Sequence, residues 1–327
     1  MVAYEIKRYS LEYKNSWNEF ISNSKNGTFL LNRNYMDYHA NRFEDHSVII
    51  SNNENIVALL PANISENKLI SHQGLTYGGL IYSLETKLGD LIEIFKLLLD
   101  FLNKNNIQYL VYKSVPQFYW THYNDDVDWI LFKLNGKVIR KDSAYVIDNS
   151  KLKIGYQERR KRSIKKAKKL NFFIDEGISH LKLFWNDILI PNLQEKHGVN
   201  PVHTLVEIEE LADKFPNNIR QYVIFLDGII VAGCTIFETE NVAHAQYISG
   251  NEIGRNSGCL DLLFDWLIIE RYQGKMYFDF GIANEEMGQK INKGLMDWKE
   301  GFGARAMSHD FYEINTSDFN KLEDIYC

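Results

Sequence analysis

The sequence contains few cysteines, and their spacing excludes two classes of small site. Only Cys234, Cys259 and Cys327 are present, and no two of them form a CxxC pair. A disulfide framework and a cysteine-based zinc site both require more cysteines at closer spacing. His197 and His203 also lack a second metal-type pair nearby. We therefore expect no metal site, and the cysteine usage fits a reducing compartment.

An overall positive charge is also missing. The chain has 37 Lys and Arg residues against 43 Asp and Glu residues, a formal net charge of −6 and a pI of about 5.9. No protein-wide positive field is therefore available to hold nucleic acid or an anionic membrane. Contact with a polyanion such as tRNA would have to be local.

Long apolar runs are absent as well. No stretch of about 18 apolar residues, the length needed to cross a bilayer, occurs in the chain. The segment from Met1 to Asn15 alternates charged and apolar residues and lacks the apolar centre of a signal peptide. We therefore expect no integral membrane segment and a cytoplasmic protein.

The sequence does contain enough apolar material for more than one core. Hydrophobic residues make up 45% of the 327 positions and aromatic residues 13%, a composition typical of a folded chain. Single hydrophobic cores rarely grow beyond about 250 to 300 residues. Two domains are therefore expected.

Two segments separated by about 170 residues share one order of elements. In the first half, a hairpin over 48–60 precedes strands at 68–72 and 80–82, a helix over 88–102 and a strand over 107–113, with a glycine-rich loop over 74–79. In the second half, a strand over 242–249, a loop over 250–258, a helix over 260–270 and a strand over 276–280 follow the same order. The pattern predicts an α/β protein with two similar units, 1–148 and 149–327, each a mixed β-sheet flanked by helices.

A basic helix opens the second unit. Eight Lys and Arg residues lie between Arg159 and Lys169, and Ile164, Ala167 and Leu170 form one narrow apolar face. Helices over 183–193 and 208–215 and a hairpin around Asp227-Gly228 follow. The basic helix is either a solvated face or a phosphate-binding surface.

The segment from Tyr247 to Gly258 enters a helix directly and is the first candidate site. Glycines allow backbone N–H groups at a helix N-terminus to face an anion such as a pyrophosphate. The candidate contacts are Ile248, Gly254, Arg255, Asn256, Ser257 and Gly258. The alternative is a tight surface loop.

A second candidate lies at the end of a buried strand, in Tyr277-Phe278-Asp279-Phe280-Gly281. Asp279 can accept a proton from an attacking amine, or it can cap the next helix or pair with Lys299. The Asp-Phe-Gly sequence is not a kinase motif, because no glycine-rich nucleotide loop, strand lysine or His-Arg-Asp loop accompanies it.

The strand over 242–249 supplies a third candidate. Alternation places His244, Gln246 and Ile248 on one face, and Tyr247 on the other. His244 is therefore either a base or a hydrogen-bonded packing residue.

Two further segments hold candidate substrate contacts. His203 and Glu207 are spaced to share one helical face, unless Thr204 caps that helix. His72, Thr76 and Tyr77 lie in the glycine-rich loop of the first half, which is otherwise a strained turn.

The Asp-Phe-Gly strand followed by Lys299-Glu300-Gly301-Phe302-Gly303 resembles the Fem-type aminoacyltransferases and related acyltransferases of the GNAT superfamily. Leu59-Leu60-Pro61-Ala62-Asn63 and the Ser71-His72 loop extend this resemblance over nearly the whole chain. It implies two tandem GNAT-like domains, the first binding an acceptor and the second binding an acyl donor and performing catalysis.

The same resemblance assigns roles to residues. Lys299 would stabilise the oxyanion of a tetrahedral intermediate, and the segment up to Gly258 would hold the pyrophosphate of coenzyme A. His244 would border the acyl-transfer site. The implied substrate contacts are His72, Thr76, Tyr77, His203, Glu207, Gln246, Tyr247 and Tyr312.

The sequence also departs from the family pattern in two places. Gly254 and Gly258 do not keep the usual spacing of the coenzyme A loop, and no long heptad insertion of the kind used for tRNA is present. We expect an N-acyltransferase that uses acetyl-CoA or another acyl-CoA and acylates an amino sugar, nucleotide-linked, for a surface polysaccharide. Aminoacyl transfer from tRNA to a peptidoglycan precursor, and a non-catalytic binding module, are the alternatives.

Overall fold

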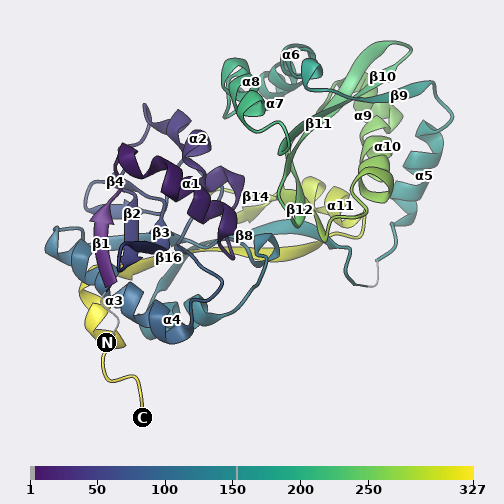
Figure 1. Ribbon diagram of the computed structural model, residues 1–327. Coiled ribbons are helices and arrows are strands. Elements are labelled where there is room, and N and C mark those ends of the chain that lie inside the picture. Colours follow the sequence, from purple (N-terminus) through teal and green to yellow (C-terminus); the bar gives the residue numbers. More distant parts are fainter. Residues whose placement is uncertain (1–3, 152–153) are drawn as a thin grey trace. The chain divides into compact units, whose positions relative to one another are not determined.

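The computed structural model describes residues 4–151 and 154–327, and its contacts divide the chain into two compact units (Figure 1). Unit 1 comprises Met1–Asp142 and Ser308–Cys327, and unit 2 comprises Ser143–Met307. The predicted single boundary after residue 148 differs from this division. The chain crosses between the units within β8 (Lys137–Asp148) and again within β16 (Arg305–Asn315), because the end of β16 pairs with a strand of unit 1.

Unit 1 contains an antiparallel sheet built around the predicted hairpin. Its strand order is β1 (Tyr4–Arg8), β2 (Val48–Asn52), β3 (Asn55–Leu60) and β6 (Ile81–Tyr82). Strands β2 and β3 pair from Val48 with Leu60 to Asn52 with Asn55, so the hairpin prediction is confirmed.

The second group of strands in unit 1 contains a parallel pair with a helical crossover. Its strands are β4 (Asn63–Ser65), β5 (Lys68–Ile70), β7 (Tyr109–Lys113) and β16, with β5 parallel to β7. Parallel strands need a long connection, and α3 (Leu88–Lys104) supplies it. Its apolar stripe is buried through Leu91, Phe95, Leu98 and Leu102, which explains why the helical period was readable in the sequence.

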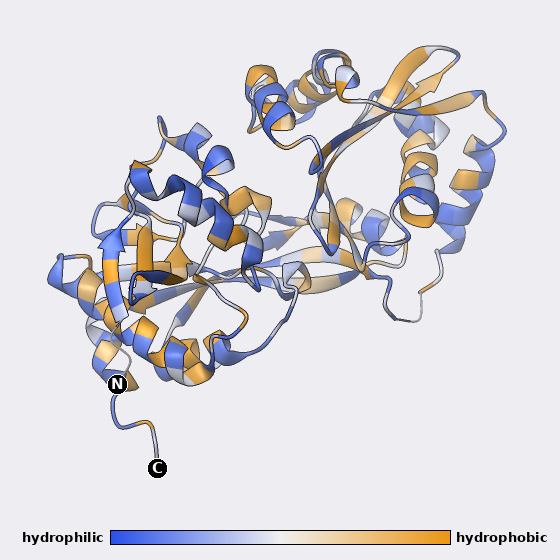
Figure 2. Cartoon of the chain, in the orientation of Figure 1, coloured by the Kyte–Doolittle hydropathy of each residue, from blue (hydrophilic) through white to orange (hydrophobic). Residues whose placement is uncertain are grey.

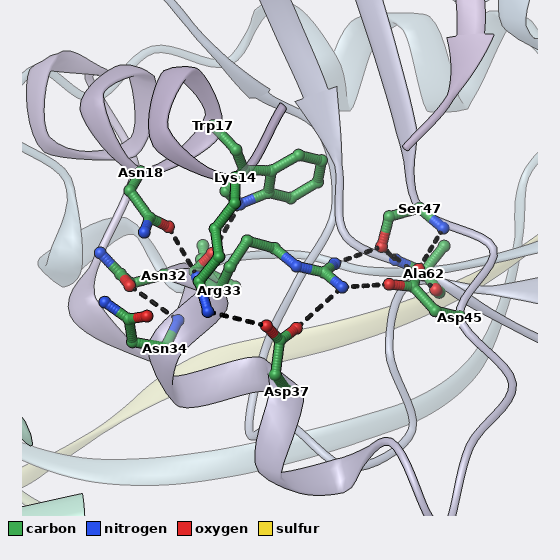
Figure 3. A network of polar contacts seen from close by, with 11 residues as sticks. Lys14, Trp17, Asn18, Asn32, Arg33, Asn34, Asp37, Asp45, Ser47 and Ala62 are labelled. Atoms are coloured by element: carbon green, nitrogen blue, oxygen red, sulfur yellow. Dashed lines mark hydrogen bonds and ion pairs between the residues drawn. The ribbon is translucent and has the colours of Figure 1, made fainter. Parts of the chain in front are cut away.

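The remaining helices of unit 1 are α1 (Lys14–Asn23), α2 (Arg33–Met36) and α4 (Asp126–Lys133). The Arg33 side chain, only 5% exposed, anchors this region (Figure 3). Its guanidinium pairs with Asp45 and Asp37, donates to the hydroxyl of Ser47 and lies over the ring of Tyr9. Burial raises the pKa of Asp45, but Arg33 and Ser47 outweigh it and the net pKa is lowered. The charge of Arg33 is thus compensated by two carboxylates, although its buried Nε has no hydrogen-bond partner among the residues that the structure describes.

The main strands of unit 2 pair in the order β8, β13, β12, β11, β10, β9. The strands are β13 (Tyr277–Ile282), β12 (Val242–Gly250), β11 (Ile229–Glu238), β10 (Ile219–Leu226) and β9 (Phe172–Glu176). Asp227 and Gly228 both have positive φ, 49° and 82°, as the predicted two-residue hairpin between β10 and β11 requires. All neighbouring pairs run antiparallel except β12 and β13.

Along the chain, helices and a small hairpin come before, between and after these strands. They are α5 (Glu158–Ala167), α6 (Leu181–Phe184), α7 (Ile190–His197), α8 (Leu205–Lys214), α9 (Glu252–Ser257), α10 (Cys259–Trp266) and α11 (Lys293–Glu300), with β14 (Asn284–Glu285) and β15 (Lys290–Ile291). Figure 2 shows β10 and β11 predominantly apolar and α5 predominantly polar. The core includes a stacked pair, Phe264 and Phe280, with ring centroids 5.2 Å apart.

The predicted internal repeat is confirmed at the level of topology. In each unit a strand is followed by a loop, a helix and a second strand parallel to the first, β5 to β7 in unit 1 and β12 to β13 in unit 2. The segment 250–258 was predicted to be loop throughout, which is wrong, because α9 occupies most of it. Within the described parts of the chain, no helix combines the length and apolar character of a membrane span.

Candidate active site

The site of unit 2 lies where the parallel strands β12 and β13 separate. Their pairing covers three positions, Val242 with Tyr277, Ala243 with Phe278 and His244 with Asp279. Beyond Asp279 the register of β13 against β8 shifts, and β12 runs on to Gly250 beside β11. His244 and Asp279 therefore occupy the last position before the two strands part.

These two side chains are hydrogen-bonded to each other. Nδ1 of His244 lies 2.7 Å from Oδ2 of Asp279, and the other carboxylate oxygen, Oδ1, accepts the backbone N–H of Gly281 at 2.7 Å. Asp279 is only 2% exposed. Burial raises the pKa of this carboxyl, but the His244 ring and the Gly281 N–H outweigh it, and the net pKa is lowered.

An ionised Asp279 fixes the proton of the histidine. Because a carboxylate only accepts hydrogen bonds, the shared proton resides on Nδ1 of His244. In the neutral form of this histidine, Nε2 carries the lone pair that can accept a proton from an attacking group. From the sequence, either His244 or Asp279 could be the base. The geometry favours His244 as the proton acceptor and Asp279 as the group that orients its ring.

A β-bulge interrupts the alternation of β12, so the predicted grouping of His244, Gln246 and Ile248 on one face is wrong. Tyr247 pairs with Thr235 and Ala245 pairs with Ile236, which leaves Gln246 at the bulge and reverses the alternation. Tyr247 therefore shares the face of His244, and both Tyr247 and the strand partner of His244, Phe237, contact His203. Ile248 lies on the opposite face, against the core that contains Ala243 and Ala245.

Lys299 reaches the same site from α11. Its Nζ donates to the carbonyl oxygens of Gly281 at 2.9 Å and Ile282 at 2.7 Å, and its side chain is buried. Burial lowers the pKa of Lys299 to about 8, although the charge of Asp279 opposes this shift. The contacts show Lys299 holding the backbone at the end of β13, and its oxyanion role stays a prediction.

Gly281 links Lys299 to the histidine. Its φ of +72° lies in the left-handed region that glycine adopts without strain. In this conformation its N–H faces Asp279 while its carbonyl accepts from Lys299. Lys299, Gly281, Asp279 and His244 thus form one continuous hydrogen-bonded chain.

Unit 1 has the same topology without this chemistry. The last pair of its parallel ladder joins Ile70 and Val111, two residues that cannot transfer protons. A buried lysine, Lys113, follows on β7 and donates to the carbonyls of His72 and Leu75. The contrast assigns the candidate catalytic groups to unit 2.

The predicted anion-binding segment makes more hydrogen bonds within the protein than expected. Asn251 caps α9 by accepting the Gly254 N–H at 2.9 Å, and Arg255 donates to the Asn192 side chain and the Gly250 carbonyl. Gly258, with φ +81°, separates α9 from α10. Ser257 donates to the Gly254 carbonyl and the Asn256 carbonyl accepts from Lys166. Several polar groups of this segment are therefore already used.

Gly254 has a packing role that a substitution can test. A Cβ atom there would collide with the carbonyl oxygen of Val231 on β11. We expect Gly254→Ala to lower the free energy of unfolding by about 1–3 kcal/mol, measured by urea denaturation. Gly274→Ala is the matched control, because nothing lies within 4 Å of its added Cβ. Equal stability of the two variants would contradict a packing role for Gly254.

Of the two alternatives for this segment, the structure shows the helix cap, so His203 and Glu207 do not share a helical face. Thr204 caps α8 in a reciprocal pair with Glu207, which leaves His203 before the helix. His203 is buried, and its Nδ1 and N–H both contact the Tyr247 hydroxyl. Burial raises the pKa of Tyr247. His203 and Tyr247 are thus brought together as a pair that the sequence did not reveal.

The candidates of unit 1 are mostly interior. Tyr77 is 1% exposed and donates to Thr28 at 2.9 Å, His72 is buried with φ +64°, and Thr76 is exposed. Burial lowers the pKa of His72 to about 3. Tyr312 pairs with Tyr112 of β7, so it lies in unit 1 and not in the predicted second domain. Their roles as acceptor contacts stay predictions.

A buried ion pair beside the predicted donor segment was missed. Arg160 of α5 pairs with Asp261 in the first turn of α10, and the Trp298 indole also donates to Asp261 at 2.8 Å. Arg160 shares the buried face of α5 with Ile164 and Ala167. Its spacing from these two apolar residues is the feature of the sequence that could have predicted its burial. Within the described residues, no group of three or more His, Cys, Asp or Glu side chains is arranged to hold a metal ion.

Neither a protein-family model nor a curated protein sequence matches the chain. Among solved structures, FemX matches over 98% of this chain and 99% of its own, with a TM-score of 0.66 at 11% sequence identity. The chain has the two-domain GNAT fold of FemX. The sequence-based expectation of fold is therefore confirmed.

Two other structures share the FemX fold. The C-terminal domain of a candidate lysylphosphatidylglycerol synthetase from Agrobacterium fabrum matches with a TM-score of 0.62 at 12% identity, over 94% of this chain and 93% of that one. A tandem GNAT protein from the clavulanic acid biosynthesis pathway matches with a TM-score of 0.50 at 8% identity, over 96% and 99% of the two chains. At these identities the comparison establishes the fold.

Proposed function

We propose that this protein is an N-acyltransferase whose catalytic base is His244. The observation that carries the proposal is the His244–Asp279 hydrogen bond at the point where β12 and β13 separate. The corresponding pair of unit 1, Ile70 and Val111, is apolar, so the polar pair is specific to one unit. The FemX fold supports acyl or aminoacyl transfer as the class of reaction.

The reaction that these groups fit is direct attack of an amine on an activated acyl carbonyl. The amine nitrogen forms a bond to the carbonyl carbon and releases one proton, which Nε2 of His244 accepts. The tetrahedral intermediate then collapses, the bond to the donor sulfur or oxygen breaks, and that leaving group takes a proton. Asp279 stabilises the charged imidazole without becoming protonated, and no covalent enzyme intermediate is needed.

The donor proposed is a small acyl thioester such as acetyl-CoA, and the acceptor is the amine of an amino sugar, nucleotide-linked, in surface-polysaccharide synthesis. The net charge of −6 supports a small donor over a large nucleic acid. The residues proposed to contact substrate next to the base are Gln246, at the bulge of β12, and Tyr247, which shares the face of His244 beyond the bulge. Lys299 is proposed to position the end of β13 and to favour developing negative charge.

A second candidate is aminoacyl transfer from tRNA to an amine, which the FemX and lysylphosphatidylglycerol synthetase neighbours favour. The same base serves both reactions, because only the leaving group differs. A non-catalytic binding module is the third candidate, and it gives no reason for a buried His–Asp pair at the split of the sheet.

The proposal is tested by a matrix of donors and acceptors. The purified protein is incubated with acetyl-CoA or with charged tRNA, in combination with amino-sugar nucleotides, and products are followed by mass spectrometry. Transfer of an acetyl group to a sugar amine is the expected result. Transfer from charged tRNA alone would replace the donor and retain the class of reaction. No product from any donor, with ligand binding intact, would overturn the enzymatic proposal.

A further inference from the structure

The exposed surface of α5 concentrates positive charge. The segment 158–169 contains eight Lys and Arg residues and one acid, Glu158, within a chain whose formal net charge is −6. Arg160 is buried in its pair with Asp261, and the other seven cations are exposed. Figure 2 shows α5 as a predominantly polar helix. The positive charge is therefore presented outward from one short element of an acidic protein.

The cations of α5 follow the helical period. Arg159, Arg162 and Lys166 recur at spacings of three and four residues, and Lys169 continues this line just after the helix ends. At 1.5 Å per residue, the line from first to last is about 15 Å long. Together these side chains, which we call the α5 stripe, form an elongated cationic surface about as long as three turns of a partner helix.

Much of this charge lacks a partner within the protein. Lys161 pairs with Glu158 and Lys168 pairs with Asp265. For Arg159, Arg162, Lys165 and Lys169 no carboxylate lies within ion-pair distance among residues 4–151 and 154–327. Elsewhere in unit 2, the half-buried Arg271 and the exposed Lys293 do have carboxylate partners. The α5 stripe is thus the main uncompensated cationic surface on this unit's described residues.

The α5 stripe lies beside the proposed donor segment. Lys166 donates to the Asn256 carbonyl at 3.3 Å, and α5 packs against α10, where Arg160 pairs with Asp261. Figure 1 shows α5 running alongside α9 and α10. A group held on α5 is therefore close to the segment at which the donor is expected to enter.

Some of the polar groups in that segment are already engaged within the protein. Asn251 already accepts the Gly254 N–H, and the Arg255 guanidinium is engaged by Asn192 and Gly250. The donor's anionic part then needs a further surface, and the α5 stripe lies beside the segment, where Lys166 contacts the Asn256 carbonyl. It is longer than a diphosphate requires and is confined to a single helix, whereas nucleic acids contact several basic elements over a large area.

We infer that the α5 stripe docks the acidic helix of a carrier protein that delivers the acyl group as a thioester on its phosphopantetheine arm. This inference rests on the proposed acyltransferase function and names the source of its donor. Complementary charge on the two helices would steer the encounter and set the orientation of the arm. The reactive thioester is the same as in acyl-CoA. The difference is that an acidic protein takes the place of the anionic nucleotide part of coenzyme A.

Binding of a fluorescently labelled bacterial holo-acyl carrier protein, followed by anisotropy, tests this inference without requiring turnover. We expect saturable binding that weakens as salt is added. The double variant Arg159→Glu and Arg162→Glu should weaken it by about tenfold or more. The control is Lys182→Glu with Lys214→Glu, which makes the same change of net charge on α6 and α8 and should leave binding within about twofold.

Four outcomes separate the inference from the proposed function. Equal loss in both double variants, or binding of labelled tRNA in place of the carrier, would overturn the carrier inference. Turnover of acetyl-CoA without any carrier binding would also overturn it, while leaving the N-acyltransferase proposal standing. Carrier binding that depends on Arg159 and Arg162, without consumption of any donor, would support the docking surface and count against the enzymatic proposal.

Discussion

Replacing His244 by alanine should lower kcat by about 10²–10⁴-fold, the effect of removing a positioned general base. Its ring is hydrogen-bonded to Asp279 and its side chain is only 13% exposed, so the substitution removes the proton acceptor and also the partner of a buried carboxylate. Steady-state kinetics with the donor and acceptor that give product measure the effect, and thermal denaturation checks the fold. Added imidazole should restore part of the rate, because it can occupy the space of the missing ring.

The chain offers a matched control for this experiment. His180 forms a second His–Asp pair in unit 2, with its Nε2 2.9 Å from Asp175 on β9, the last strand of the sheet. His180→Ala should therefore leave kcat within about twofold, since it breaks a surface pair of the kind that contributes little. Full activity of the His244 variant, or an equal loss in both variants, would contradict the assignment of the base.

Replacing Lys299 by methionine should remove a pH-dependent part of the stability. The folded-state pKa of Lys299 is about 8, below the ordinary value of 10.5, because burial disfavours the ammonium. Between these values the unfolded chain binds more protons than the folded chain, so the free energy of unfolding of the wild type rises with pH. The rise relative to Lys299→Met should reach roughly 3 kcal/mol by pH 10.5, measured by urea denaturation between pH 7 and 10.5.

Lys293 provides the comparison for this measurement. It lies on the same helix, its side chain is 80% exposed, and it pairs with Asp297 one turn further on. The difference between wild type and Lys293→Met should stay flat to within about 0.5 kcal/mol over the same range. A flat difference for Lys299 as well would show that its ammonium is not disfavoured by burial. The hydrogen bonds from Lys299 to the carbonyls of Gly281 and Ile282 would then need another explanation.

Much of the architecture was readable from the sequence because it is local. The hairpin at 48–60 and the turn at Asp227-Gly228 follow from turn chemistry, and α3 follows from one apolar stripe. The repeat of strand, loop, helix and strand then predicted two units. The two compact units differ from a division after residue 148 because β8 and β16 each belong partly to both units, and no local signal marks a strand that is shared.

The candidate site divides in the same way. His244 and Asp279 were both chosen from their own strands, but their hydrogen bond depends on a parallel register between residues 35 apart. The sequence therefore supplied the two groups and not the division of labour between them. Lys299 was found through the family motif, whereas its two carbonyl contacts depend on the left-handed backbone of Gly281.

The weaker predictions assumed that polar residues near glycines face a ligand. Tyr77 and His72 are buried in unit 1, and the 250–258 segment folds into α9. In these cases a side chain or backbone group found its partner inside the protein. The Asn251 cap and the contact of Gly254 with β11 could not be predicted without the positions of the strands.

The order in which the strands of unit 1 are made has a consequence for synthesis on the ribosome. Strand β7 ends at Lys113, and its partner β16 pairs with it through Phe311 to Asn315, after all of unit 2 has been translated. Closing such a long loop is entropically costly and slow compared with local pairing. The β7 edge must therefore wait, unpaired on that side, while unit 2 emerges. A nascent chain stalled near residue 300 would expose this edge to chaperones and proteases until synthesis is completed.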